Sequence, residues 1–184
     1  MIVRSLDIIL SLFGLILLSP IISVLLIIGF FDTGSPIIRQ ERVGVSQKPF
    51  HLLKFRSMQL NTQAVATHLV QVNAITKWGS LLRKSKLDEL PQLFNVLTGD
   101  MSLVGPRPNL FNQGELLAER GKRGVYSVRP GITGLAQINK IDMSTPQLLA
   151  ETDAKMIDHL NVVYYFKYIF LTLSFKGFGD RVRK

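Results

Sequence analysis

The chain has no cysteine among its 184 residues. This absence excludes a disulfide scaffold, a thiolate metal site and a cysteine nucleophile. Charged residues are also scarce, at 19% of the chain, whereas a typical soluble domain contains about 25%. Apolar residues make up 47%, which excludes intrinsic disorder because a disordered chain requires low hydrophobicity. The composition and length therefore indicate one folded domain with little solubilising surface.

Acidic residues are fewer than basic ones, and the excess is unevenly placed. The chain has 22 Lys and Arg against 13 Asp and Glu, a net charge of +9. Residues 1–31 carry only Arg4 and Asp7, which cancel, so the whole excess lies in residues 32–184. A basic body is typical of proteins that bind nucleic acid, lipid headgroups or a phosphorylated substrate. From charge alone, a non-catalytic membrane-tethered basic module that binds anionic lipid or nucleic acid stays open as an alternative.

A long apolar segment occupies the N-terminal part. Between Asp7 and Asp32 there are 24 uncharged residues, of which 18 are apolar. As a helix they would extend roughly 36 Å, which exceeds the ~30 Å hydrocarbon core of a bilayer. A cleaved signal peptide fits poorly, because the run is longer than the usual apolar region and no A-x-A-like site follows it. We therefore predict that residues 1–31 anchor the chain in a membrane.

Ser19 and Pro20 lie at the middle of this segment. Proline removes one backbone donor and clashes with the carbonyl of Ile16, so we expect a kink. The flanking halves, 8–18 and 21–31, have 11 residues each, about 16 Å of helix, which reaches only midway through a bilayer. Basic residues on both sides favour cytoplasmic flanks. A kinked spanning helix and a re-entrant helix-break-helix both stay open; in the second, the Ser19 hydroxyl would satisfy backbone groups freed by Pro20.

Residues 32–184 are predicted to form a mixed α/β, mainly helical domain with short strands. The patterns predict strands over 37–38 and 50–55, and a helix or loop over 60–75. They predict helices over 78–84, 87–97 and 115–122, a helix that starts at Thr145-Pro146, and a helical pattern over 154–173. Residues 105–108 and 130–134 are expected to form a rigid loop and a tight turn. The aromatic residues near the C-terminus are typical of an interfacial amphipathic helix or of a core helix.

The acidic pair Asp88-Glu89 is the first candidate for chemistry. Pro91 is tolerated only in the first turn of a helix, which places the helix start near Asp88 and Asp88 at or beside the N-cap. There the helix dipole would favour the ionised carboxylate, which is able to attack phosphorus. The two carboxylates are also suited to Mg²⁺, which binds through one or two carboxylates and substrate phosphates. Taken alone, an Asp cap followed by Glu is equally an ordinary helix start.

Basic residues in several segments are candidate phosphate ligands. Arg107 stands between two prolines that fix the backbone, and a guanidinium is suited to bidentate phosphate contacts. For each residue the simpler interpretation is a solvated surface charge. The histidines show no metal-ligand spacing, and no glycine-rich nucleotide loop is present. The candidate phosphate ligands are Lys54, Arg56, Arg83, Arg107 and Arg129.

The candidate residues lie in a series of longer motifs. These are RQERVG (39–44), KFRSM (54–58), LLR (81–83), LDELPQL (87–93), NVL (95–97), GDMSLVGPRP (99–108) and PGITGLAQ (130–137). The motifs resemble those of the bacterial sugar transferases and, more narrowly, of the small monotopic polyprenyl-phosphate phosphoglycosyl transferases. The similarity covers nearly the whole chain in the family's order, including the Ser-Pro break.

The resemblance implies a re-entrant helix broken at Ser19-Pro20 and a catalytic domain on the cytoplasmic face of the bacterial inner membrane. It also implies that Asp88 attacks a UDP-sugar, releases UMP and passes the phosphosugar to undecaprenyl phosphate, the first membrane step in making a surface glycan such as an O-antigen, exopolysaccharide or lipopolysaccharide. In the family, Mg²⁺ assists the Asp-Glu pair, here Asp88 and Glu89. Lys54, Arg83 and Arg107 match positions near the phosphates, and no nucleic acid partner is implied.

Two positions depart from the family pattern. The family usually reads Asn-Gly-Arg-Asn where this chain has residues 139–142, Asn-Lys-Ile-Asp, so an arginine is missing. Tyr165 stands where the family tends to have an aspartate in its last helix, whereas Asp153 matches an earlier family aspartate. We expect these differences to leave the reaction type intact and to affect sugar recognition.

Overall fold

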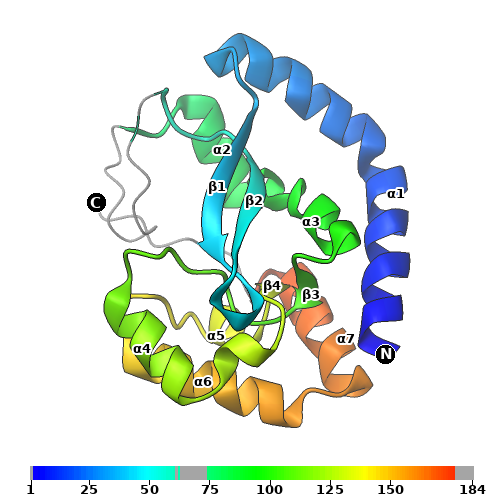
Figure 1. Cartoon of the computed structure of the whole chain (residues 1–184). Coiled ribbons are helices and arrows are strands. Elements are labelled where there is room, and N and C mark those ends of the chain that lie inside the picture. Colours follow the sequence, from blue (N-terminus) through cyan, green and yellow to red (C-terminus); the bar gives the residue numbers. More distant parts are fainter. Residues whose placement is uncertain (1, 61, 63–73, 177–184) are drawn as a thin grey trace.

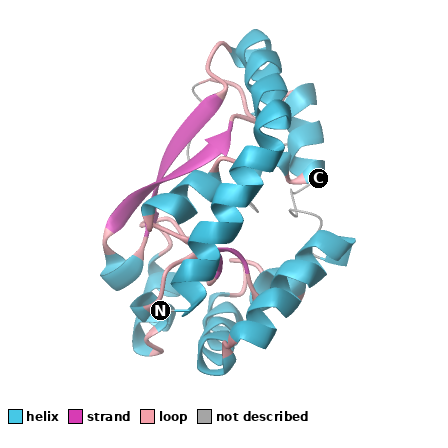
Figure 2. Ribbon diagram, turned by 90° about the vertical axis from the view of Figure 1, so that its right-hand side faces the viewer, coloured by secondary structure: helices cyan, strands magenta, loops and turns pink. Residues whose placement is uncertain are grey.

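The computed structural model of the chain describes residues 2–60, 62 and 74–176 (Figure 1). The predicted helix or loop over 60–75 and His68 therefore lie largely or wholly outside the described residues. The described part is mainly helical, as predicted, and its strands form two short pairs (Figure 2). The helices and strands are α1 (Ile2–Thr33), β1 (Ile37–Val43), η1 (Val45–Gln47), β2 (Pro49–Phe55), α2 (Lys77–Ser85), η4 (Leu87–Glu89), α3 (Gln92–Thr98), β3 (Ser102–Val104), α4 (Gly114–Lys122), η5 (Val125–Ser127), β4 (Gly131–Thr133), α5 (Leu135–Ile138), α6 (Pro146–His159), α7 (Val162–Leu171) and η6 (Thr172–Lys176).

The apolar segment forms one long helix, α1, that bends near its middle (Figure 1). Helical structure continues through Pro20, so a bend takes the place of the expected break. The Ser19 hydroxyl donates to the Ile16 carbonyl at 2.8 Å, the carbonyl that a backbone N–H at position 20 would otherwise bind. The predicted kink and the predicted use of the Ser19 hydroxyl are both confirmed.

Both halves of α1 pack against the body of the protein. In the first half, Val3, Leu6 and Leu10 contact a core cluster that contains Tyr165 of α7. In the second half, Leu25 joins a cluster with residues of β2 and α2. The rest of the helix surface is apolar and exposed, and α1 is the one helix within the described residues that is long and apolar enough to cross a membrane. The exposed large apolar residues of α1 are Ile2, Ile8, Ile9, Leu12, Phe13, Ile16, Leu17, Ile21, Val24, Ile27, Ile28, Phe30 and Phe31.

The two charges of α1 attach its first half to the body. Arg4 donates to the carbonyls of Val96 and Leu97 at the end of α3, at 2.6 and 2.9 Å. Asp7 is only 2% exposed, and its Oδ1 accepts hydrogen bonds from the Ser102 hydroxyl at 3.0 Å, the Leu103 N–H at 2.9 Å and the Tyr165 hydroxyl at 2.8 Å. Arg4 and Asp7, whose charges cancel, therefore each form specific hydrogen bonds between the helix and the body.

The structure contains longer strands than the sequence predicts in the first pair, and a second pair that the sequence does not predict. β1 and β2 form an antiparallel hairpin in which Ile37 pairs with Phe55 and Val43 with Pro49. β3 and β4 pair in parallel, so the expected turn at 130–134 is in part a strand. Their pairing brings two backbones together, because a Cβ at Gly131 would lie 2.0 Å from the nitrogen of Gly105. Only glycine fits at that position.

The helix predicted over 87–97 is wrong at its start. Lys86 adopts a left-handed conformation with φ of 56° and ends α2. Asp88 then lies in the short 3-10 turn η4, and α3 begins at Gln92 with Pro91 at its cap position. Asp88 is thus not the N-cap of α3, and the helix-dipole argument for its ionisation does not apply.

The continuous helical pattern predicted over 154–173 is also wrong. Leu160 has an extended backbone at the end of α6, and Asn161 has one at the start of α7. The Asn161 side chain accepts from the Tyr164 N–H at 3.0 Å and so caps the second helix. The start predicted at Thr145-Pro146 is confirmed in position, although the Thr145 side chain caps no backbone N–H.

Candidate active site

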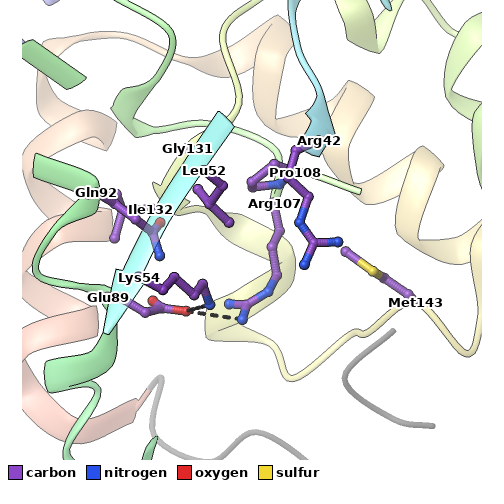
Figure 3. A pocket seen from close by; sticks show the side chains of 10 residues that line it. All are labelled: Arg42, Leu52, Lys54, Glu89, Gln92, Arg107, Pro108, Gly131, Ile132 and Met143. Atoms are coloured by element: carbon purple, nitrogen blue, oxygen red, sulfur yellow. Dashed lines mark hydrogen bonds and ion pairs between the residues drawn. The ribbon is translucent and has the colours of Figure 1, made fainter. Parts of the chain in front are cut away.

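A small cleft, partly open to solvent, lies between the β1–β2 hairpin, the η4–α3 segment and the loop after β3 (Figure 3). It contains the carboxylate of Glu89 among three cationic side chains, and apolar side chains complete its walls. The lining residues are Arg42, Leu52, Lys54, Glu89, Gln92, Arg107, Pro108, Gly131, Ile132 and Met143.

Glu89 is held by two cations. Its Oε1 lies 3.0 Å from Lys54 Nζ and 3.1 Å from Arg107 Nη2 (Figure 3). The Glu89 side chain is 10% exposed, that of Lys54 17% and that of Arg107 22%, so solvent screens these pairs only weakly. Cations from two separate segments therefore converge on one carboxylate oxygen of a third segment. Two of the predicted phosphate ligands thus meet one predicted catalytic residue.

The surroundings of Glu89 favour its ionised form. Burial alone would raise the pKa of this carboxyl, but the charges of Lys54, Arg107 and Lys86 and the hydrogen bond from Lys54 outweigh it and lower the pKa to about 2. Glu89 is therefore a fixed negative charge at neutral pH. This property suits a charge-positioning or metal-binding role better than proton transfer.

Asp88 is the neighbour of Glu89 in the same 3-10 turn and is 5% exposed. It is not among the described residues that line the cleft, so Glu89 and not Asp88 forms the visible wall. A 3-10 turn has about three residues per turn, so successive side chains point in different directions. The turn thus places two buried carboxyl groups next to each other, one of which faces the cleft.

Lys54 and Arg107 are each supported from behind. The Asn95 side chain accepts from the Leu53 N–H at 2.9 Å and donates to the His51 carbonyl at 2.8 Å. It therefore holds the β2 backbone at two residues just before Lys54. Arg120 Nη1 donates to the carbonyl of Arg107 at 2.9 Å. The alternating strand pattern and the rigid proline loop suggested neither of these two supporting side chains.

Arg120 belongs to a buried ionic network. Its Nε and Nη2 donate to Asp153 Oδ2 at 3.0 and 2.7 Å, and Nη1 also donates to Asn109 Oδ1 at 2.9 Å. Arg120 is 1% exposed and Asp153 is fully buried. Burial raises the pKa of Asp153, and the positive charge of Arg120 opposes that effect. The network fixes both sides of Pro108 and hence the loop that carries Arg107.

Two polar residues of the cleft were not predicted as site residues. Arg42 lies on β1, where Gln40 and Arg42 face inward and Arg39 and Glu41 face solvent. Burial and the neighbouring charge of Arg107 lower the pKa of Arg42 to about 10. Gln92, 3% exposed, has a buried Nε2 with no hydrogen-bond partner within the part of the chain that the structure describes. The alternation along the strand, together with the RQERVG motif, was the available signal for Arg42.

Three predicted phosphate ligands do not line the cleft. Arg56 donates to the Ser35 carbonyl at 2.8 Å and so supports the turn before β1. Arg129 donates to the Gly99 carbonyl at 2.7 Å. Arg83 lies near the end of α2, five residues before Asp88, and is absent from the described residues that form the cleft wall.

The two departures from the family pattern have different locations. Ile141 packs against the buried core around Leu116, whereas the nearby Met143 lines the cleft and accepts a hydrogen bond from Gln113 Nε2 at 3.1 Å. This segment is therefore placed to affect substrate recognition. Tyr165 is fully buried and donates a hydrogen bond to Asp7 of α1, which indicates a role in helix packing; its effect on sugar recognition stays a prediction.

The residues at the cleft fit a magnesium ion only in part. Among the described residues, no group of three or more His, Cys, Asp or Glu side chains is placed to hold a metal. Asp88 and Glu89 supply two carboxyl groups, and two cations already bind Glu89 Oε1. Because Mg²⁺ commonly keeps several waters and binds through one or two carboxylates plus substrate phosphates, this donor set fits an ion that arrives with a phosphorylated substrate.

Comparison with known proteins places these motifs in a family. Residues 1–177 match the family described as bacterial sugar transferase. The chain belongs to the bacterial sugar transferase family. The resemblance inferred from the motifs is therefore confirmed, and the match includes α1 as well as the cleft.

Several relatives within the family are named for related reactions. In an alignment of 188 residues, the chain is 39% identical to the UDP-glucose:undecaprenyl-phosphate glucose-1-phosphate transferase of Escherichia coli (strain K12). The alignment covers 97% of this chain and 40% of that protein. In an alignment of 186 residues, the chain is 36% identical to the galactosyl transferase CpsE of Streptococcus agalactiae; the alignment covers 93% of this chain and 41% of that protein. It is 39% identical over 171 residues, 92% of its length, to the uncharacterized sugar transferase EpsL of Bacillus subtilis, and covers 84% of it. The chain thus spans about two fifths of the first two relatives and most of the third.

Proposed function

We propose that this protein transfers a sugar phosphate from a UDP-sugar to undecaprenyl phosphate and releases UMP, with Asp88 as the nucleophile. The observation that carries the proposal is the convergence of Lys54 and Arg107 on Glu89, beside the buried Asp88, in a chain of this family. Two relatives are named as transferases that act on undecaprenyl phosphate. Cations at fixed positions are what the transfer of a group between two anionic phosphates requires.

The reaction balances in two displacements. In the first, an oxygen of the Asp88 carboxylate bonds to the β-phosphorus, the bond from that phosphorus to the bridging oxygen breaks, and UMP leaves with the electron pair. In the second, a phosphate oxygen of undecaprenyl phosphate bonds to the same phosphorus, and the Asp88 carboxylate leaves. No net proton transfer is needed, which agrees with a Glu89 that stays ionised.

Lys54 and Arg107 have two tasks in this scheme. They hold Glu89 in place, and they offer positive charge to the phosphoryl oxygens that gain negative charge as the transfer proceeds. Asp88 and Glu89 are the residues that would bind Mg²⁺ together with the substrate phosphates. When bound, the ion supplies charge neutralisation on those phosphates.

The packing of α1 against the body suits a lipid acceptor. Both halves of α1 pack on the same body, and a helix crossing the bilayer straight through would carry one of these contacts to the far side. We therefore infer a re-entrant arrangement, with the helix bend near Ser19-Pro20 in the membrane and the body at the cytoplasmic face of the bacterial inner membrane. Such a body is placed to reach a phosphate at the bilayer surface.

Release of UMP tests the proposal. The purified protein is incubated with individual UDP-sugars and Mg²⁺, with and without undecaprenyl phosphate, and UMP is quantified. We expect sustained release only with the lipid, and less than one equivalent without it. Asp88→Asn, which keeps the size of the side chain, should abolish both signals.

Two results would contradict the proposal. UMP release that persists in Asp88→Asn would remove Asp88 as the nucleophile. No release with any UDP-sugar would favour the alternative of a membrane-tethered module that binds anions without catalysis.

A further inference from the structure

We propose that Arg42 is a substrate-binding residue that holds the phosphate leaving as UMP; this inference rests on the proposed function. Arg42 lies at the end of the cleft away from Glu89, with Arg107 between them (Figure 3). The cationic side chains of Lys54, Arg107 and Arg42 thus form a row that begins at the acidic pair. A diphosphate is a ligand whose charges are spaced along such a row.

The hydrogen bonds of Arg42 show no counter-ion for its charge among the described residues. Its Nη2 donates to the neutral amide oxygen of Gln40 at 2.9 Å. Within the described ranges, its buried Nε has no hydrogen-bond partner and its guanidinium forms no ion pair with a carboxylate. Arg42 is half-buried and its Nε is fully buried, and both a partly desolvated charge without an anion and an unsatisfied buried donor are costly. Such a group at the wall of an open cleft is suited to an anionic ligand that enters the cleft.

The direction of the displacement identifies the ligand phosphate. In an in-line displacement the leaving oxygen departs on the side of phosphorus opposite to the attacking oxygen. If the carboxylate pair meets the β-phosphorus, the α-phosphate must lie farther from that pair, toward Arg42. The guanidinium then stabilises the charge that UMP gains when the bridging bond breaks.

The same geometry gives Arg42 a part in the second displacement. Undecaprenyl phosphate attacks the phosphorus from the side opposite to Asp88, which is the side that UMP has left. The acceptor phosphate therefore enters the subsite beside Arg42 after UMP has departed. One guanidinium serves the outgoing and the incoming phosphate in turn.

Binding of UMP to the full-length protein tests the inference without turnover. UMP affinity is measured by the ligand-induced shift in thermal unfolding and by inhibition of the reaction. We expect Arg42→Met to weaken UMP binding about 10- to 100-fold, the range for loss of charge-assisted hydrogen bonds, and Arg42→Lys to have an intermediate effect. Arg39→Met is the matched control, because Arg39 lies on the same strand but faces solvent; its affinity should stay within about twofold of wild type.

A second measurement separates binding from structural support. Because Arg42 is a half-buried charge with no counter-ion among the residues that the structure describes, Arg42→Met should leave the unfolding temperature of the ligand-free protein unchanged or raise it. A lower unfolding temperature together with unchanged UMP affinity would overturn the inference, as would equal weakening in Arg39→Met. A wild-type protein that releases UMP while Arg42→Met and Arg42→Lys bind UMP normally would refute only the inference. A wild-type protein that neither binds nor releases UMP would refute both.

Discussion

The guanidinium of Arg120 lies 2.9 Å from the backbone carbonyl of Arg107, and the same guanidinium binds the buried carboxylate of Asp153. A buried ion pair is weak support for stability, because the cost of removing both charges from water offsets their attraction. The pair instead links α4 and α6 to the loop whose Arg107 side chain binds Glu89. The buried network thus positions a residue that faces the cleft.

Substitutions in this network should separate stability from activity. Arg120→Met leaves Asp153 buried and unpaired, and we expect the free energy of unfolding to fall by about 3–5 kcal/mol. Arg120→Met combined with Asp153→Leu removes both charges and should regain most of that loss. The double variant should nevertheless show a KM for the UDP-sugar raised about 3- to 10-fold, because the Arg107 carbonyl has lost its donor. Chemical denaturation and steady-state kinetics check the two effects; normal KM in a stable double variant would limit the network to packing.

The low pKa of Glu89 predicts a pH-dependent stability. A carboxyl whose pKa falls from 4.5 to about 2 on folding stabilises the folded state above pH 4.5, and this contribution is lost as the pH falls toward 2. Glu89→Gln lacks the titration. The difference in unfolding free energy between wild type and Glu89→Gln should therefore shrink as the pH is lowered from about 5 to 2. Denaturation in chelator-containing buffer measures it, and a pH-independent difference would contradict the assigned charge contacts.

The hydrogen bond from Tyr165 to Asp7 should matter for stability and not for catalysis. Tyr165→Phe removes one of three donors to a buried carboxylate oxygen, and we expect a loss of about 1–3 kcal/mol in unfolding free energy. Tyr164→Phe is the matched control, because Tyr164 lies on the same helix and is exposed. Unfolding in lipid nanodiscs provides the comparison. A change in KM for Tyr165→Phe at unchanged stability would show that this position acts on substrate.

The bend in α1 predicts that its two ends lie on the same side of the membrane. The absence of cysteine allows single labels to be introduced as Ser5→Cys and Thr33→Cys without background. Both should react with a membrane-impermeant maleimide in inverted membrane vesicles and neither in intact spheroplasts. If the two positions react from opposite sides, the helix spans the bilayer and the re-entrant arrangement is excluded.

The parts of the fold that depend on neighbouring residues were predictable from the sequence. Pro20 and the Ser19 hydroxyl act on a carbonyl one turn away, and α2 and α4 follow from local patterns. The left-handed conformation of Lys86 was not predictable, because a non-glycine residue at positive φ gives no clear sequence signal. Because Lys86 ends α2 in this conformation, α3 starts later than predicted and Asp88 is not its N-cap residue.

The candidate site was likewise predictable only in part. Lys54, Glu89 and Arg107 were identified from charge and motif, and the structure brings them together. Arg42 and Gln92 were missed because each is notable for a buried nitrogen that has no hydrogen-bond partner among the described residues, and only the folded cleft reveals that. The Arg120–Asp153 pair joins positions 33 residues apart on two helices, a contact that periodicity does not predict.

Mapping the site of the covalent intermediate tests most directly the central claim that Asp88 is the nucleophile. The full-length protein is mixed with a UDP-sugar and Mg²⁺ in the absence of lipid, quenched in acid and digested, and the peptides are sequenced by mass spectrometry. We predict a phosphosugar adduct on Asp88 that disappears when undecaprenyl phosphate is added before the quench. An adduct on another residue, or UMP release that requires both substrates together and leaves no adduct, would contradict the account.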